Sequence, residues 1–189
     1  RACEIARVLM PAYGVSWLRD RIARGLLAVG VTPNALTLAG TVFTVGAGAC
    51  YAVGGGHRLA WGLAPGGPSA WPLAALGMLL CSAACDMLDG AVARLGDRKT
   101  RFGAFLDSTM DRVSDFAIWA GIALYYARQA PPNLTFALLA MLAFLGGFLI
   151  SYTRARAEDL IASCSVGYWQ RGERMAAVLI GTAACNLPA

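Results

Sequence analysis

Long apolar stretches separated by short basic loops are the feature that most restricts how this chain can fold. Residues 35–54 carry no charged side chain, and about 20 apolar residues in a helix span the hydrocarbon core of a membrane. Similar apolar segments follow at 71–94, 103–127, 133–153 and 173–185. Because a backbone inside lipid must satisfy its own hydrogen bonds, we predict an all-α membrane protein with five visible transmembrane helices.

The first 31 residues have a different pattern. Apolar residues such as Trp17, Leu18 and Ile22 are mixed with arginines, which is typical of a helix that lies in the membrane interface. Thr32-Pro33-Asn34 then breaks the pattern, and Asn34 is a suitable helix cap. We therefore predict an interfacial amphipathic helix within 1–31 and a transmembrane domain over 32–189.

Charge indicates the orientation and the partners. Charged residues make up 14% of the chain, against about 25% in soluble proteins. The basic residues collect in the N-terminal region and after the second and fourth spans, whereas the other two loops hold only Arg58 and Arg128. The positive-inside rule places the three basic segments in the cytoplasm. A net charge of +5 suits an anionic membrane surface, and basic residues scattered over short loops argue against nucleic acid.

Acidic residues inside the spans are the main functional signal. Asp86 and Asp89 lie near the cytoplasmic end of the second span, and Asp107, Asp111 and Asp115 lie in the third. Each costs roughly 2.5–3.5 kcal/mol on insertion scales. Residues three or four apart share a helix face, so Asp86 and Asp89 project to one side, and so do Asp107 and Asp111. The short connecting loop makes the two helices antiparallel neighbours, and both pairs should meet at one level.

Four converging carboxylates repel one another and need a cation. Oxygen ligands favour Mg²⁺, Mn²⁺ or Ca²⁺ over zinc or copper. Four aspartates can hold two such ions roughly 3.5–4 Å apart, the arrangement that activates phosphoryl groups. Gly90 allows a ligand to approach the backbone, and Arg94 can reach a phosphate. Asp115 lies outside this group, and its spacing leaves open whether it supports the site or is merely hydrogen-bonded.

Two other classes of protein could also carry acidic residues inside a membrane. A cation or proton transporter could use intramembrane aspartates as a relay, but its acids should lie near the midplane with an exit path on the far side. A structural or lipid-binding membrane protein would not need four buried aspartates. Both alternatives fit the position of the acids less well than a metal-dependent site at the cytoplasmic end does.

The residues around the acids resemble a family signature. Residues 86–111 fit the pattern D-x2-DG-x2-AR-x8-G-x3-D-x3-D. This pattern is that of the CDP-alcohol phosphotransferases, also called CDP-alcohol phosphatidyltransferases, and the order of spans fits as well. The resemblance implies an enzyme that transfers a phosphatidyl group from CDP-diacylglycerol to a polar alcohol and releases CMP. It also implies two Mg²⁺ or Mn²⁺ ions per active site, a homodimer, and catalysis within 32–189.

The resemblance also implies residue roles. Asp86, Asp89 and Asp107 would bind one or both ions, and Asp111 would bind the second ion and deprotonate the acceptor hydroxyl. The CDP-lipid would be contacted by Asn34, Ala35, Leu36, Thr37, Gly90, Ala93, Arg94 and Thr100. The family has six spans, whereas this chain begins at Arg1 and shows five, so we expect a missing sixth span and a missing native N-terminus.

The acceptor must be inferred from residues outside the shared signature. Residues 151–158 and 167–174 resemble the corresponding stretches of bacterial phosphatidylinositol-phosphate synthases, in which basic residues matching Arg154 and Arg174 bind the phosphate of inositol phosphate. That subfamily often has lysine at the position of Arg154. Arg171 is a third candidate, although it and Arg156 could equally serve membrane topology. The resemblance implies a multi-pass protein of a bacterial cell membrane, and glycerol phosphate remains an alternative acceptor.

Overall fold

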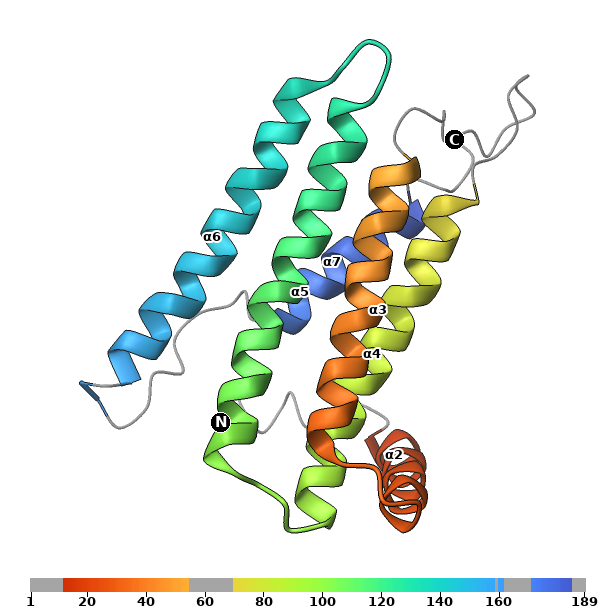
Figure 1. Ribbon diagram of the computed structural model, residues 1–189, viewed down its shortest axis with the longest axis vertical. Coiled ribbons are helices and arrows are strands. Elements are labelled where there is room, and N and C mark those ends of the chain that lie inside the picture. The colour runs from red at the N-terminus through yellow and green to blue at the C-terminus, as the bar shows by residue number, and fades with distance from the viewer. Residues whose placement is uncertain (1–11, 55–69, 159, 162–170, 185–189) are drawn as a thin grey trace.

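Helices make up all the regular structure in the part of the chain that is described. The structure is a computed structural model that describes residues 12–54, 70–158, 160–161 and 171–184. These residues contain no strand, so the predicted all-α class is confirmed (Figure 1). In chain order the helices are α2 (Ala12–Ala28), α3 (Pro33–Gly54), α4 (Trp71–Leu95), α5 (Arg101–Ala127), α6 (Leu134–Glu158) and α7 (Arg171–Ala184).

The helix bounds follow the apolar pattern closely. α3, α4, α5 and α7 begin and end within two residues of the predicted segments. α6 continues to Glu158, five residues beyond the apolar run, and the Arg154–Glu158 pair at 3.7 Å supports this extra turn. Helix ends that carry charged side chains can extend beyond the hydrocarbon core into the headgroup region.

Three of the described helices are long and apolar enough to cross a membrane, namely α3, α4 and α6. α5 has sufficient length, at 27 residues, but its aspartates and arginines lower its hydropathy. The 14 described residues of α7 are fewer than the roughly 20 that a span requires. The crossing of all five predicted segments therefore stays a prediction.

A tight reversal joins α4 to α5. α4 ends where Asp97 adopts a left-handed conformation with φ of 48°, and the Arg98 amide donates to the Ala93 carbonyl at 3.0 Å. α5 then begins at Arg101 and is capped by Thr100, whose Oγ1 accepts a hydrogen bond from the Gly103 amide at 2.9 Å. The two helices therefore run in opposite directions, and their acidic residues lie at comparable depths.

α3 is the central helix of the bundle and packs against both α4 and α5. The crossing with α5 depends on Gly48 and Gly121, because a Cβ at either position would overlap backbone of the other helix. Thr44 of α3 and Ser82 of α4 share a buried hydrogen bond at 2.6 Å. The sequence had predicted α4 and α5 as direct neighbours, and this was wrong in detail. Their described residues make little close backbone contact, because α3 packs against both.

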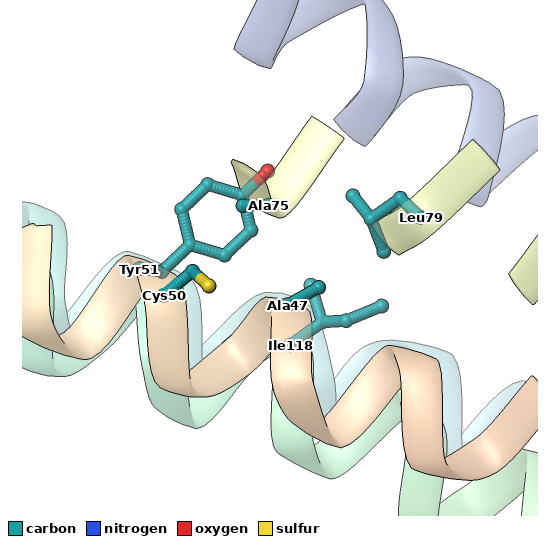
Figure 2. Packing of buried hydrophobic residues seen from close by; sticks show 6 residues of the cluster. All are labelled: Ala47, Cys50, Tyr51, Ala75, Leu79 and Ile118. Carbon is teal, nitrogen blue, oxygen red and sulfur yellow. The ribbon is translucent and has the colours of Figure 1, made fainter. Parts of the chain in front are cut away.

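A hydrophobic core formed by α3, α4 and α5 fixes α7 in place. Ala47, Cys50 and Tyr51 of α3 are buried with Ala75 and Leu79 of α4 and Ile118 of α5 (Figure 2). Apolar residues of α7 pack on this cluster, and the Thr182 and Tyr51 hydroxyls share a hydrogen bond. α7 is thereby anchored along its length, and its first residue is directed toward the acidic residues of α4 and α5.

The short helix α2 lies at the end of the molecule that holds the α4–α5 loop (Figure 1). Ala23 is fully buried against Ala91 and Val92 of α4, whereas Trp17 and Leu18 remain exposed. The Arg21 guanidinium lies over the Trp17 ring at 5.3 Å. This combination suits a membrane interface, as predicted for 1–31, although residues 1–11 lie outside the described part of the chain.

Adding a methyl group at Gly48 should destabilise the bundle. In Gly48→Ala the new Cβ would overlap the carbonyl oxygen of Ala117, so α3 and α5 would have to separate. Overpacking of this kind costs roughly 1–3 kcal/mol or more. Thermal unfolding in detergent, followed by circular dichroism, should therefore start at a clearly lower temperature. Gly77→Ala is the control, since nothing lies within 4 Å of a Cβ there. Equal melting of the two variants would contradict the assigned helix crossing.

Candidate active site

Four aspartates meet around one small cavity. Asp86 and Asp89 of α4 and Asp107 and Asp111 of α5 line a space of about 10 Å³, together with residues of α3 and with Arg171 of α7. Each pair lies on one face of its helix because its members are three or four residues apart. The two pairs therefore converge, as their spacing predicted.

Three of these carboxylates fit a divalent cation. Asp86, Asp89 and Asp107 each place one carboxylate oxygen within 4.8 Å of the other two. Two oxygens on opposite sides of one Mg²⁺ lie about 4.2 Å apart, given Mg–O distances of 2.0–2.1 Å. Small side-chain adjustments would bring the three onto one ion. Asp111 borders the same cavity but is not part of this triplet.

α3 positions the α4 pair from the other side. Thr37 Oγ1 donates a hydrogen bond to Asp89 Oδ2 at 2.9 Å. One turn further along α3, a Cβ at Gly40 would lie 3.2 Å from the Cβ of Cys85, so α3 and α4 approach closely at the level of the acids. The sequence had placed Thr37 only beside the CDP-lipid. Its contact with Asp89 has no signature in the sequence, because the two residues are 52 positions apart.

The arginines of α7 complete the charge arrangement. Arg171 Nη1 lies 3.0 Å from Asp86 Oδ1 and 2.9 Å from Asp111 Oδ1, and thus links α4 to α5. Its Nε lies 3.6 Å from Asp115 Oδ1, and Arg174 Nη2 lies 3.4 Å from Asp115 Oδ2. Asp115 is buried and faces both guanidinium groups. The open question about Asp115 is therefore answered in part, since it holds the two arginines on α7 against α5.

A larger cavity adjoins the acidic residues. It has a volume of about 230 Å³ and shares Asp89 and Asp107 with the smaller space. Of the residues expected to contact CDP-lipid, its lining includes Asn34, Thr37, Gly90, Ala93 and Thr100. Leu36 lines the smaller cavity, whereas Ala35 is exposed and lines neither. Arg94 is also exposed, and its Nη1 would lie 3.5 Å from a Cβ at Gly90.

Two basic residues of this cavity were missed by the sequence predictions. Arg98 and Lys99 line it from the α4–α5 loop, and both had been interpreted only as signals of membrane topology. Their position between Ala93 and Gly103, both part of the matched pattern, was the available clue. Gly103 also lines the cavity, and a Cβ there would lie 3.3 Å from Asn34 Oδ1 and 3.0 Å from Thr100 Oγ1.

Arg154, predicted to bind the acceptor phosphate, lies near the end of α6. It lies in the last turn-and-a-half of α6 and pairs with Glu158 of the same helix. Arg174 is closer to the centre, since its guanidinium lies against Gly147 of α6 as well as facing Asp115. The two arginines thus occupy different surroundings, although the sequence had grouped them.

A sequence profile of the CDP-alcohol phosphatidyltransferases matches residues 30–187, which is most of the chain and contains every acidic residue of the site. The chain belongs to this family of enzymes. The family prediction made from residues 86–111 is therefore confirmed. The match also includes α3 to α7, so it covers both cavities and the arginines of α7.

Several relatives of this phosphatidyltransferase are named as synthases of inositol phosphate lipids. The chain is 45% identical over 107 residues to archaetidylinositol phosphate synthase of Methanothermobacter thermautotrophicus, covering 57% of this chain and 51% of that protein. It is 37% identical over 169 residues to phosphatidylinositol phosphate synthase of Mycolicibacterium smegmatis, covering 88% and 68%. The chain thus spans about half the length of the first relative and about two thirds of the second.

Solved structures share the fold. The crystal structure of Mycobacterium tuberculosis phosphatidylinositol phosphate synthase with CDP-DAG bound matches with a TM-score of 0.74 and 33% identity, over 90% of this chain and 77% of that one. A second structure of that enzyme, in complex with manganese and citrate, matches with a TM-score of 0.71 and 33% identity, over 90% and 74%. The membrane-enzyme fold predicted from the sequence is confirmed.

Proposed function

We propose that this phosphatidyltransferase transfers the phosphatidyl group of CDP-diacylglycerol to inositol phosphate and releases CMP. The observation that carries the proposal is the cavity of about 230 Å³ that shares Asp89 and Asp107 with the acidic site. A nucleotide in the cavity would place its diphosphate beside the carboxylates. The CDP-DAG and manganese named for the mycobacterial structures support both substrate and cofactor.

Residues of α3, α4 and α5 would bind the CDP-lipid. Gly90 and Gly103 lack side chains that would otherwise fill the cavity wall, while Arg98 and Lys99 offer positive charge to the diphosphate. Asp86, Asp89 and Asp107 would hold one or two divalent cations, Mg²⁺ or Mn²⁺, with Thr37 orienting Asp89. Cations bound there would neutralise the diphosphate and stabilise charge developing on the phosphorus oxygens.

Asp111 would act as the general base. An alcohol is a weak nucleophile, so a carboxylate within hydrogen-bond reach must accept its proton. The acceptor oxygen forms a bond to the phosphorus of the phosphatidyl group, and the bond from that phosphorus to CMP breaks, with the electron pair leaving on CMP. Asp111 borders the same small cavity as Asp107, and its carboxylate would lie next to the expected diphosphate position.

The basic loop supports one orientation in the membrane. Arg94, Arg98, Lys99 and Arg101 lie around the α4–α5 reversal, at the end of the molecule that also holds α2 (Figure 1). We infer that this end faces the cytoplasm, where the polar acceptor and anionic lipid surface are available. The acyl chains of the CDP-lipid would stay in the bilayer along the apolar helices. A homodimer is also part of the proposal, implied by the family.

The acceptor is tested by a panel of alcohols. The purified protein is given labelled CDP-diacylglycerol with inositol phosphate, glycerol phosphate, free inositol or serine. We expect product with inositol phosphate and little with free inositol, because the arginines would then lack their anionic partner. If glycerol phosphate were the preferred substrate, the proposed acceptor would be wrong, but the phosphatidyl transfer reaction of the family would still hold.

Removing Arg174 should weaken acceptor binding selectively. A hydrogen bond between an arginine and a phosphate contributes roughly 1.5–3 kcal/mol. Arg174→Ala should therefore raise the KM for inositol phosphate about ten- to a hundredfold and leave the KM for CDP-diacylglycerol nearly constant. Arg154→Ala is predicted to act in the same direction. Saturation curves for both substrates measure this, with Arg24→Ala on the exposed face of α2 as the control. An equal rise in the KM values of both substrates would indicate that these arginines serve folding or membrane topology.

A further inference from the structure

Arg171 occupies the position of a counter-ion in the acidic site. One nitrogen, Nη1, contacts Asp86 Oδ1 and Asp111 Oδ1 at 3.0 and 2.9 Å, so a single guanidinium bridges α4 and α5. The side chain is only 22% exposed and borders the small cavity. Arg171 therefore neutralises part of a cluster that would otherwise repel itself.

A divalent cation and Arg171 compete for the same space. The cavity of about 10 Å³ that remains beside Arg171 holds roughly one water. A cation coordinated through Oδ1 of Asp86 or of Asp111 would lie about 2.0–2.6 Å from the oxygen that Nη1 now contacts. Positive charges at such short range repel strongly in a partly buried site. Cation binding at these carboxylates therefore disfavours the two contacts of Nη1.

The other end of the guanidinium is tethered independently. Nε faces Asp115 at 3.6 Å, and this nitrogen is buried without a hydrogen-bond acceptor among the described residues. Asp115 lies one turn beyond Asp111 and also faces Arg174. Arg171 can thus give up Asp86 and Asp111 while staying beside Asp115 and Arg174. Its free Nη atoms would then lie near the base Asp111, together with a second arginine that is suited to a phosphate.

We propose that Arg171 exchanges partners during substrate binding: it pairs with Asp86 and Asp111 until a divalent cation binds these carboxylates, and it then binds the acceptor's phosphate. The exchange leaves Asp111 free to accept the proton of the acceptor hydroxyl. Cation binding and acceptor binding are consequently coupled, with each favouring the other. The acceptor half of this inference rests on the proposed function, whereas competition with the cation does not.

The competition is tested by metal binding alone, without either substrate. Mn²⁺ affinity is measured by electron paramagnetic resonance for the parent protein, Arg171→Gln and Arg24→Gln. Arg171→Gln should bind Mn²⁺ about tenfold more tightly, within the range usual for coupled sites, and Arg24→Gln should match the parent. In chelator, Arg171→Gln should unfold at a lower temperature than the parent. Added Mn²⁺ should raise the unfolding temperature of Arg171→Gln by more than it raises that of the parent. Unchanged or weaker Mn²⁺ binding by Arg171→Gln overturns the proposal.

The exchange is tested with inorganic phosphate, the group common to phosphorylated acceptors. In the parent, Mg²⁺ should tighten phosphate binding about tenfold, and in Arg171→Gln by less than about threefold. Equal phosphate affinity with and without Mg²⁺ in the parent overturns the exchange even if Arg171→Gln does not fold. Failure of every alcohol in the acceptor panel would instead refute the proposed function and leave the Mn²⁺ result standing.

Discussion

Replacing Asp111 by asparagine should lower kcat by about 10²- to 10⁴-fold, the range that a positioned general base contributes. Asn has nearly the same shape but cannot accept the proton of the acceptor hydroxyl. Asp86, Asp89 and Asp107 form a triplet of carboxylates without Asp111, so binding of cation and nucleotide should survive. The measurement is a pair of experiments on Asp111→Asn, namely turnover with inositol phosphate and equilibrium binding of CDP-diacylglycerol.

The pair of measurements separates two roles of Asp111. If Asp111→Asn loses turnover but binds CDP-diacylglycerol within a few-fold of the parent's affinity, Asp111 acts as the base. A parallel collapse of both would show that Asp111 is chiefly a metal ligand, and the base would have to lie elsewhere. Asp97→Asn is the matched control, because Asp97 is exposed at the same end and asparagine readily adopts its φ of 48°. This variant should retain both turnover and binding.

Removing divalent cations should abolish the transfer reaction. A cation acting as a Lewis acid on a phosphoryl group contributes several kcal/mol, so thorough chelation should lower the rate by at least about 10³-fold. Titration with Mg²⁺ or Mn²⁺ should restore it. The donor set at Asp86, Asp89 and Asp107 consists of carboxylate oxygens, which favour these ions over soft metals.

The fold should persist during chelation, because Arg171 and Arg174 already balance part of the negative charge from α7. Far-ultraviolet circular dichroism of the chelated protein should therefore match that of the loaded protein. If activity were undiminished after chelation, the metal-dependent mechanism would be wrong. Loss of helical signal together with activity would show that the cations are needed for structure, and chelation would then not report on catalysis.

Much of the local structure could be predicted from the sequence because its causes are local. Apolar runs of about 20 residues predict helices, and the bounds of α3, α4, α5 and α7 agree with those runs. Spacings of three and four place Asp86 with Asp89, and Asp107 with Asp111, on single faces. A short loop then forces an antiparallel reversal. These features depend on residues within a few turns of one another.

The matched pattern was equally informative about the site. It contains the aspartates and several residues that line the larger cavity, including Gly90, Ala93 and Gly103. All of them lie within 26 consecutive residues on either side of one reversal. Arg98 and Lys99 lie in the same stretch but outside the fixed positions of the pattern, so their side chains could be placed only when the loop conformation was known.

The tertiary structure alone decided how distant segments meet. That α3 packs against both α4 and α5 depends on the Gly48–Gly121 crossing, between residues far apart in the chain. The hydrogen bond from Thr37 to Asp89 and the contacts of Arg171 with Asp86 and Asp111 likewise join separate helices. Periodicity shows which face of a helix is polar, but which partner that face meets depends on the packing of the whole bundle. The sequence therefore predicted the acidic cluster and its family and named Arg171 and Asp115 as candidates, whereas only the fold revealed that Arg171 pairs with Asp86 and Asp111 and that Asp115 is buried beside it.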